Sequence, residues 1–499
     1  MTDKRRVYLA VDLGASGGRV LAGLFDGGRL AIEEVHRFEN GAVHAGGRMY
    51  WDLLALWRQI LAGLRAAGAT YGDQIVSVGV DTWGVDFALL GRGDELLGNP
   101  RHYRDRRTAG ILDKAFAIVS REEIFANTGL QFIEFNTLFQ LVAMKLEHSP
   151  LLDAAESFLM MPDVFHWLLT GEKANEITDA STTQFYNPAT QQWATELFEK
   201  FGLPSRILGR LAAPGENLGK LRGDAALESG LGGVDVVLPG THDTASAVMA
   251  VPAAGDPADK PNWCYISSGT WSLMGVETPR PVVTDKCREL NFTNEAGVGG
   301  TTRLLKNIAG LWLVQECRRI WKQAGNEFDW AELVERATAS RPLESLIDPD
   351  DAGFNAPRDM PEAIREYCRQ RGQPVPETEG AVIRSALESL ALRYRAVLNW
   401  LEELTGAKIE TIHIVGGGTQ NRLLSQMAAD ACNRRVVAGP VEATAIGNVM
   451  MQAVSAGDVG SIREARDVIR RSFDVEEFTP RQPRPWEEAF SRFQQLVPG

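Results

Sequence analysis

The sequence predicts an α/β protein made of two domains that repeat one plan around a central cleft. Its 499 residues are too many for a single hydrophobic core, so two large domains or three smaller ones are expected. A strand–tight turn–strand unit stands at the head of each half, at residues 7–25 and 263–276. At 409–432 a strand, a glycine loop and a helix follow one another, an order typical of layered α/β folds.

The first half begins with elements of strand character. Val7–Val11 is a short apolar run that predicts a buried strand, and residues 19–25 and 30–38 predict two more. A helix is expected over 52–67 because apolar side chains recur there on one face. These side chains are Leu53, Leu56, Trp57, Ile60, Leu61 and Leu64. With a further strand at 75–80, the order of elements indicates a sheet that is mixed at its start.

The predicted linker covers residues 250–262, which are rich in Pro, Ala, Gly and Asp. We therefore expect an N-terminal domain at 1–249 and a C-terminal domain at 263–499. The second domain is expected to contain a long helix over 381–404, with Gly406 as its C-terminal cap. The other elements expected there are strands at 263–266, 271–276, 409–415 and 435–438, and helices at 422–432 and 442–456.

Composition and charge exclude several classes of protein. The formal net charge of −13 argues against a nucleic-acid-binding face, which needs clustered basic residues. No apolar run approaches the roughly 18 residues that span a bilayer, and the polar N-terminus leads into a strand without a signal peptide. Five scattered cysteines suit a reducing compartment, so a cytoplasmic protein without disulfides or a cysteine-rich zinc site is expected.

Two tight turns have the composition of a phosphate-binding site. In the first, small residues at 14–18 let backbone N–H groups approach phosphate oxygens, and Asp12 can hold a hydrated Mg²⁺. The second turn, Ser267–Thr270, offers hydroxyls and a glycine in the equivalent place of the second half. Together the turns could clamp a triphosphate from both sides; ordinary glycine-rich hairpins are the alternative.

The glycine loop Gly416–Gly418 follows a strand and precedes a helix. It is not a Walker loop, since the chain contains no GxxxxGK[ST], and it is not a GxGxxG dinucleotide fingerprint. Bare backbone there suits a flat adenine or ribose, although a plain strand-to-helix connection would have the same composition.

Asp243 is the candidate general base. It follows an apolar strand at 234–238 and stands shortly before the linker, which places it at the mouth of the expected cleft. A carboxylate there suits proton abstraction from a sugar hydroxyl. The alternative is that Asp243 caps the helix that begins near Thr244.

Two further segments have the composition of a sugar site. Asp81–Asp86 joins Trp83 and Gly84 to two carboxylates, as sugar sites often do, although a buried Trp beside a turn is the alternative. Lys306-Asn307 is expected to open a helix that carries Asn307 and Gln315 on one face. A plain N-cap and a solvated side chain are the alternatives for these two residues.

Eleven blocks of the sequence resemble the FGGY carbohydrate kinase family and stand in the family's order between residues 10 and 448. They are AVDLGASGGRV, VDTWGVDFALL, HYRDRRT, FNTLFQL, MPDVFHWLLTG, THDTASAV, YISSGTWSLMG, TNEAG, LLKNIAGLWLVQE, HIVGGGTQN and VAGPVEATAIGN. The DTWGVDF and HDTASAV segments look more like members that phosphorylate L-rhamnulose than like those that act on glycerol or xylulose.

The resemblance implies two ribonuclease-H-like domains of the actin-like ATPase type around a catalytic cleft. The N-terminal domain would mainly bind sugar and carry the first phosphate loop, and the C-terminal domain would mainly bind ATP. The implied reaction is phosphorylation of L-rhamnulose at its C1 hydroxyl by ATP with Mg²⁺, in L-rhamnose catabolism, with Asp243 as proton acceptor. The implied sugar contacts are Gly84, His242, Asp243, Thr244 and Asn307. The implied ATP contacts are Ala15, Ser16, Gly17, Gly18, Arg19, Thr270, Gln315 and Gly417.

One departure from the family pattern and several alternatives bear on this expectation. Many relatives have a second serine where this chain has Gly17, but the backbone donors remain, so ATP binding is expected to survive. Another ketose, such as L-fuculose or D-xylulose, is the alternative substrate. An actin-like chaperone would need a large region after Gly457, and a repressor would need a helix-turn-helix before Val7. A filament protein would need no base at Asp243.

Overall fold

The computed structural model describes residues 5–254, 260–355 and 357–497. The chain divides into two units, each made of several segments. Unit 1 comprises Met1–Pro257, Glu277–Leu304 and Ala443–Phe473, and unit 2 comprises Ala258–Val276, Leu305–Glu442 and Asp474–Gly499. Within the linker expected at 250–262, residues 255–259 lie outside the described residues.

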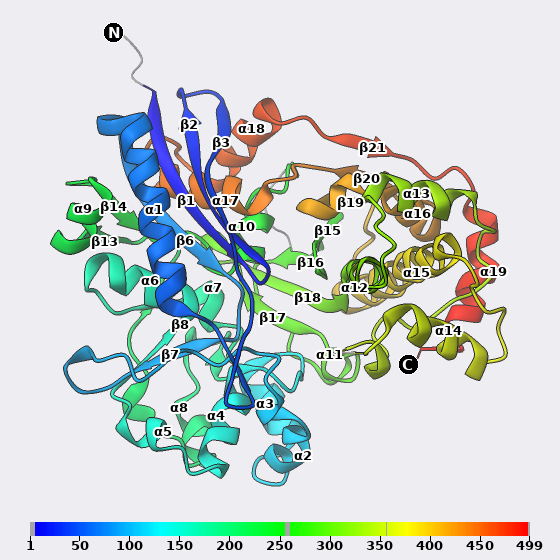
Figure 1. The fold of residues 1–499 in the computed structure, drawn as a ribbon, viewed down its shortest axis with the longest axis horizontal. Coiled ribbons are helices and arrows are strands. Elements are labelled where there is room, and N and C mark those ends of the chain that lie inside the picture. The colour runs from blue at the N-terminus through cyan, green and yellow to red at the C-terminus, as the bar shows by residue number, and fades with distance from the viewer. Residues whose placement is uncertain (1–4, 255–259, 356, 498–499) are drawn as a thin grey trace. The chain divides into compact units, whose positions relative to one another are not determined.

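Unit 1 is built on a six-stranded mixed sheet with the order β13-β14-β6-β1-β2-β3 (Figure 1). The strands are β1 Arg6–Gly14, β2 Gly17–Phe25, β3 Leu30–Glu39, β6 Ile75–Thr82, β13 Asn217–Lys220 and β14 Asp235–Val237. β1, β2 and β3 pair antiparallel, whereas β6 is parallel to both β1 and β14. The mixed start of the sheet that the sequence predicts is therefore confirmed.

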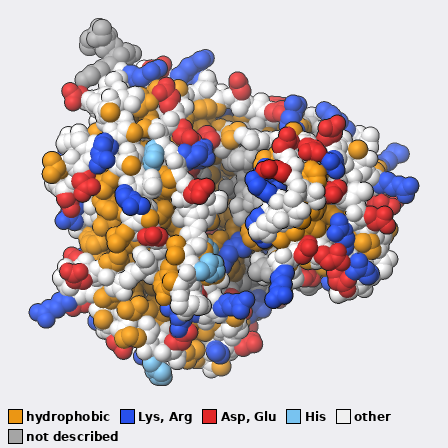
Figure 2. Space-filling view, in the orientation of Figure 1, with side chains coloured by type: hydrophobic (Ala, Val, Ile, Leu, Met, Phe, Trp, Pro, Cys, Tyr) orange, Lys and Arg blue, Asp and Glu red, His pale blue; other side chains and the backbone are white. Residues whose placement is uncertain are grey.

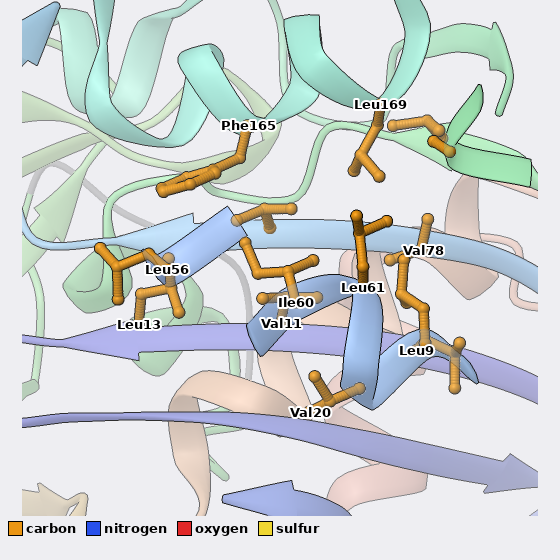
Figure 3. Close-up of a cluster of buried hydrophobic side chains, with 14 of the residues drawn as sticks. Leu9, Val11, Leu13, Val20, Leu56, Ile60, Leu61, Val78, Phe165 and Leu169 are labelled. Atoms are coloured by element: carbon orange, nitrogen blue, oxygen red, sulfur yellow. The ribbon is translucent and has the colours of Figure 1, made fainter. Parts of the chain in front are cut away.

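Helices α1 (Leu53–Tyr71) and α6 (Met161–Thr170) contribute to the core of this unit. Asp52 begins α1 by accepting a hydrogen bond from the Ala55 N–H. Figure 3 shows apolar side chains of α1 and α6 together with those of β1, β2 and β6. Burying each large aliphatic side chain contributes about 1.5–3 kcal/mol, so this cluster stabilises the sheet strands that it covers.

The second sheet has seven strands in the order β17-β18-β16-β15-β19-β20-β21. They are β15 Trp263–Ser268, β16 Trp271–Thr278, β17 Thr293–Ala296, β18 Thr302–Ala309, β19 Thr411–Val415, β20 Arg435–Ala438 and β21 Glu476–Phe478. β15 pairs antiparallel with β16 and parallel with β19, as β1 pairs with β2 and β6. The repeated plan predicted for the two halves is thus confirmed.

The helices before and after the glycine loop Gly416–Gly418 lie where the sequence predicts them. α15 covers Glu379–Thr405 and ends at Gly406, whose φ of 61° is the left-handed conformation of a C-terminal cap. α16 covers Arg422–Cys432, after a short 3₁₀ turn at Gly417–Gln420.

The prediction that a helix begins at Lys306-Asn307 is wrong. Asn307 lies on strand β18 (Thr302–Ala309), and the helix, α12, begins only at Trp312 and ends at Gln323. Most residues of β18 are buried without alternation, and such a short apolar run cannot be assigned to strand or helix from its periodicity. Gly310 stands between the strand and the helix. A Cβ there would lie 2.5 Å from the Trp271 carbonyl carbon, so the close approach of the two backbones requires a glycine.

The charged residues, the cysteines and the helices bear on the classes of protein considered from composition. Figure 2 shows Lys and Arg interspersed with Asp and Glu over the face drawn, rather than gathered into one basic patch. All five cysteines are buried, and none of them is in a disulfide. In the described part of the chain, no helix combines the length and apolar character needed to cross a membrane.

Candidate active site

Three carboxylates of unit 1 are carried by neighbouring parallel strands. Asp12 lies near the end of β1 and is in register with Asp81 of β6. Asp243 follows β14 and is the first residue of α10 (Asp243–Met249), and His242 beside it forms a parallel bridge with Thr82. Because the carboxyl ends of parallel strands meet at one edge of a sheet, the topology brings all three carboxylates to that edge.

The electrostatics of this edge favour a cationic ligand. Burial, followed by the negative charge of Asp12, raises the pKa of Asp81 well above its usual range. Burial also raises the pKa of Asp243, and the charge of Asp12 adds to this effect. Arg19 Nη2 lies 2.6 Å from Asp12 Oδ2 and pairs with that carboxylate. A cation or a proton at this edge would relieve the remaining repulsion.

Asp243 does not cap helix α10, and its carboxylate is partly exposed. The N-cap of α10 is His242, and Asp243 is the first helical residue. The Asp243 side chain is 33% exposed, so its carboxylate remains open to a ligand. Thr244 Oγ1 donates to Asp243 Oδ1 at 3.1 Å. The capping alternative therefore does not hold.

Glu176 holds the turn that carries Asp243, and sequence reasoning missed it. Its Oε2 accepts hydrogen bonds from the Thr241 N–H at 3.0 Å and from the Thr241 hydroxyl at 2.6 Å. The same carboxylate accepts from both the N–H and the hydroxyl of Thr178, whose hydroxyl in turn accepts from the His242 N–H at 3.2 Å. Nothing in the local sequence around Asn175–Glu176 signals this role, because the bonded residues are 65 positions apart.

His242 lies between Asp243 and a buried ion pair. Its Nε2 is 3.5 Å from Asp243 Oδ1, and its Nδ1 is 3.2 Å from both Glu295 Oε2 and Arg303 Nη2. Glu295 stands within the TNEAG block, but its partnership with His242 is a contact between distant segments that only the fold reveals.

Gly84 lies just after β6 and packs closely against buried polar residues. A Cβ there would lie 3.0 Å from Thr182 Cγ2 and 3.3 Å from Asp179 Oδ1, so a larger residue would force a shift. The neighbouring Trp83 is only 6% exposed, and its indole N–H donates to Asp86 Oδ2. Its ring centre lies 3.9 Å from that of Trp51, with the two rings tilted by 31°. Trp83 therefore belongs to the core, which is the alternative considered for this segment from its sequence: a buried Trp beside a turn.

The first predicted phosphate loop is the tight turn between β1 and β2. Gly14 pairs with Gly17, so Ala15 and Ser16 form the two-residue connection, and Arg19 follows on β2 beside Asp12. A Cβ at Gly18 would lie 2.3 Å from the Phe38 ring, so a larger residue would force that side chain to move. Asn40 Nδ2 donates to the Gly14 carbonyl at 2.8 Å, a supporting contact that sequence reasoning missed.

Unit 2 brings its three predicted ATP residues into one neighbourhood. Thr270 Oγ1 donates to Gln315 Oε1 at 3.2 Å, and the Trp312 N–H at the start of α12 donates to the Thr270 carbonyl. Gly418 packs on the same turn, because a Cβ there would lie 2.0 Å from Ser268 Oγ. Gly417 beside it has open space around its α-carbon.

The predicted site residues are divided between the two units. Unit 1 contains Gly84 and His242–Thr244 together with the loop at 15–19, whereas Thr270, Gln315 and Gly417 belong to unit 2. Asn307 is also counted with unit 2, unlike the other predicted sugar contacts.

Two family models match the chain over most of its length. The N-terminal domain of the FGGY family of carbohydrate kinases matches residues 7–250, and the C-terminal domain of the same family matches residues 264–456.

Curated relatives cover nearly the whole chain. A protein named rhamnulokinase from Bacteroides thetaiotaomicron is 47% identical over 98% of this chain and 99% of its own. Proteins of the same name from Oceanobacillus iheyensis and Bacillus subtilis are each 41% identical, over 94% and 95% of this chain and 97% and 96% of their own.

Solved structures show the same fold at low sequence identity. A ligand-bound xylulose kinase from Lactobacillus acidophilus superposes with a TM-score of 0.82 at 14% identity, over 98% of this chain and 97% of that one. A gluconate kinase from the same organism gives a TM-score of 0.81 at 14% identity, over 99% and 97%. These likenesses support the architecture alone.

Proposed function

The chain belongs to the FGGY family of carbohydrate kinases, and from this premise we propose that it phosphorylates L-rhamnulose. The reaction transfers the γ-phosphoryl group of ATP to the C1 hydroxyl and yields L-rhamnulose 1-phosphate and ADP, in L-rhamnose catabolism. The observation that carries this proposal is the 47% identity over 98% of the chain to a protein named rhamnulokinase. A kinase for L-fuculose or D-xylulose is the alternative within the same family.

Asp243 acts as the general base in this proposal. Its carboxylate accepts the proton of the C1 hydroxyl, while the hydroxyl oxygen forms a bond to the γ-phosphorus and the bond to the β-phosphate oxygen breaks. Its 33% exposed side chain on a held turn supports this role. The sugar is bound by Gly84, His242, Thr244 and Asn307 in addition to Asp243.

The ATP phosphates are bound by the first turn and by the residues of unit 2. Small residues at Ala15–Gly18 leave backbone N–H groups free of side-chain cover, and Arg19 adds a positive charge. Thr270, Gln315 and Gly417 contact the remainder of the nucleotide. Gly417, with open space around it, suits a flat group lying on backbone.

The carboxylates at the edge of the first sheet suit a hydrated Mg²⁺. Among the described residues, no three His, Cys, Asp or Glu side chains group as a metal site of their own. Mg²⁺ in kinases, however, takes one or two carboxylates, water and phosphate oxygens, and Asp81 Oδ1 is buried without a hydrogen-bond partner in the described structure. Asp12 would hold the ion, which when bound neutralises charge on the transferring phosphoryl group.

Sugar binding is assigned mainly to 1–249 and ATP binding mainly to 263–499, joined by a linker at 250–262. The transfer needs the γ-phosphorus near the sugar hydroxyl, so residues of both parts must serve one reaction. We place the reaction in the cytoplasm, since buried cysteines outside any disulfide suit a reducing compartment.

The test is ADP release from purified protein supplied with ATP, Mg²⁺ and a panel of ketoses and polyols. ADP release that depends on L-rhamnulose is expected. Release with none of the sugars would contradict the kinase proposal, and release only with a different sugar would contradict the substrate.

A further inference from the structure

Arg303 and Glu295 lie next to His242 but have no part in the function proposed above. Arg303 is fully buried on β18, and Glu295 is 4% exposed on β17. Arg303 Nη2 lies 3.1 Å from Glu295 Oε2, and Arg303 Nε donates to the Ala296 carbonyl at 3.0 Å. A buried guanidinium of this kind persists only where it is paired and hydrogen-bonded, so the position of Arg303 is fixed.

Arg303 determines which nitrogen of His242 carries the proton. Its Nη2 lies 3.2 Å from His242 Nδ1 in hydrogen-bond geometry, and arginine can only donate. Nδ1 of the neutral ring must therefore accept, which leaves the proton on Nε2. Glu295 Oε2 is 3.2 Å from the same nitrogen but has hydrogen-bond geometry toward no donor among the described residues.

Glu295 compensates the charge of Arg303. Burial alone would raise the pKa of Glu295, but the guanidinium of Arg303 opposes this effect, and the pKa of Glu295 is lowered. An ionised Glu295 neutralises the buried arginine, so Arg303 can donate to a neutral imidazole.

The Nε2–H of His242 faces the proposed base. Nε2 is 3.5 Å from Asp243 Oδ1, and Thr244 Oγ1 donates to that same oxygen at 3.1 Å. The hydrogen bond from Thr244, together with the nearby Nε2–H, reduces the basicity of Oδ1, so the other oxygen, Oδ2, is the better proton acceptor.

We infer that Arg303 is a positioning residue that holds His242 as its Nε2–H tautomer and thereby directs Asp243 Oδ2 toward the substrate hydroxyl. The inference rests on the proposed function. The hydroxyl proton passes to Asp243 Oδ2, the hydroxyl oxygen bonds to the γ-phosphorus, and ADP leaves with the electrons of the broken bond. The proton passes to water after the product departs.

The tautomer is measured directly on the full chain by ¹⁵N NMR of its histidine rings. The spectrum of a His242→Asn variant identifies the signals of His242. In the wild-type protein Nε2 should carry the proton and Nδ1 should not. In Arg303→Met the proton should move to Nδ1, next to the Glu295 carboxylate.

Turnover provides the second measurement, with a matched control. Arg303→Met should lower kcat roughly 10- to 100-fold with little change in KM for ATP, as expected when a reacting group loses its orientation. Arg466→Met is the control, because Arg466 is also buried in unit 1 and paired with a carboxylate, Glu277. The control should lose stability but keep the kcat of its folded fraction.

A wild-type His242 protonated on Nδ1 would overturn the inference, and so would equal turnover in the two variants. If Arg303→Met does not fold, the NMR measurement of the His242 tautomer in the wild-type protein is sufficient to test the inference. If the wild-type protein shows no turnover with L-rhamnulose, the proposed function fails, and that result is independent of the NMR measurement.

Discussion

A carboxylate that accepts a proton must be open to the substrate and held in one orientation, and Asp243 meets both conditions. Its side chain is 33% exposed, and Thr244 Oγ1 donates to one of its oxygens. Burial raises its pKa, which makes the ionised form a stronger base than an ordinary surface aspartate.

Replacing Asp243 by Asn should therefore lower kcat by roughly 10² to 10⁴, the usual contribution of a general base. The KM for ATP should change much less, since the nucleotide is held by other residues. ADP release measured with saturating sugar tests this. Asp224→Asn, a change at a carboxylate with 65% exposure in the same unit, is the control, and near-normal turnover in Asp243→Asn would refute the assignment.

The sequence identified residues of this site only where a motif carried them. Asp243, His242 and Gly84 stand in blocks shared with the family, and Asp243 is the first residue of α10 with a side chain that is 33% exposed. Glu176 and Arg303 escaped notice because their roles depend on hydrogen bonds to residues 65 and 61 positions away. No local pattern encodes such contacts.

At the scale of elements, the turn before α10 is held by the segment around β9 (Asn175–Glu176). The buried carboxylate of Glu176 accepts hydrogen bonds from the backbone and hydroxyl of Thr241. These bonds fix the chain just ahead of Asp243, so Glu176 positions the residue that is proposed as the base.

Glu176→Gln should lower kcat roughly 10- to 100-fold, because the amide NH₂ cannot accept and one set of donors loses its partner. The KM for ATP should stay nearly constant. Asp163→Asn is the matched control: burial and the charge of Glu176 raise the pKa of Asp163 well above its usual range, so Asn mimics its neutral form. Equal losses in both variants would show that Glu176 is merely structural.

Helix α6 should make stability depend on pH through His166. This side chain is fully buried and accepts from the Val80 N–H of β6, and burial lowers its pKa to about 3. The unfolded chain binds a proton near pH 6.5 but the folded chain does not, so stability is lost as the pH falls below that value. Between pH 6.5 and 5 the loss is about 2 kcal/mol.

His166→Gln can still accept from the Val80 N–H but does not titrate, so this part of the acid destabilisation should disappear. Urea unfolding of both proteins at pH 7 and pH 5 measures the difference. An identical pH dependence in the two proteins would mean that His166 is not held neutral in the fold.

Most elements followed from periodicity and turn residues, and the error at Asn307 shows the limit of that approach. Amphipathic helices such as α1 and α15 can be predicted because their apolar residues repeat on one face. The strand β18 is buried on both sides, and its short apolar run lacks the alternation that would separate strand from helix. Only its pairing in the sheet determines its conformation.

At the scale of the whole molecule, duplication of one plan was predictable because each half begins with the same strand–turn–strand unit. The assignment of segments to units was not. The segments 277–304 and 443–473 belong to unit 1 although they follow the expected linker. Contacts between residues distant in the sequence determine which unit each segment joins, and composition does not predict such contacts.

The whole reaction should require a divalent cation. EDTA should abolish ADP release, and Asp12→Ala should raise the Mg²⁺ concentration needed for half-maximal activity, because Asp12 is the carboxylate proposed to hold the ion. A Mg²⁺ titration of both proteins measures this. Full activity in EDTA would contradict the proposed role of the metal.

Comparison of kcat/KM for L-rhamnulose, L-fuculose, L-xylulose and D-xylulose tests the central claim most directly, with NMR locating the phosphate in the product. Recognition of one methyl group by apolar contact is worth about 1–3 kcal/mol, so L-rhamnulose should exceed the ketoses that lack the methyl by roughly 10- to 200-fold. The phosphate should be on C1. A different sugar preferred by about tenfold or more, or a phosphate on another carbon, would contradict the claim.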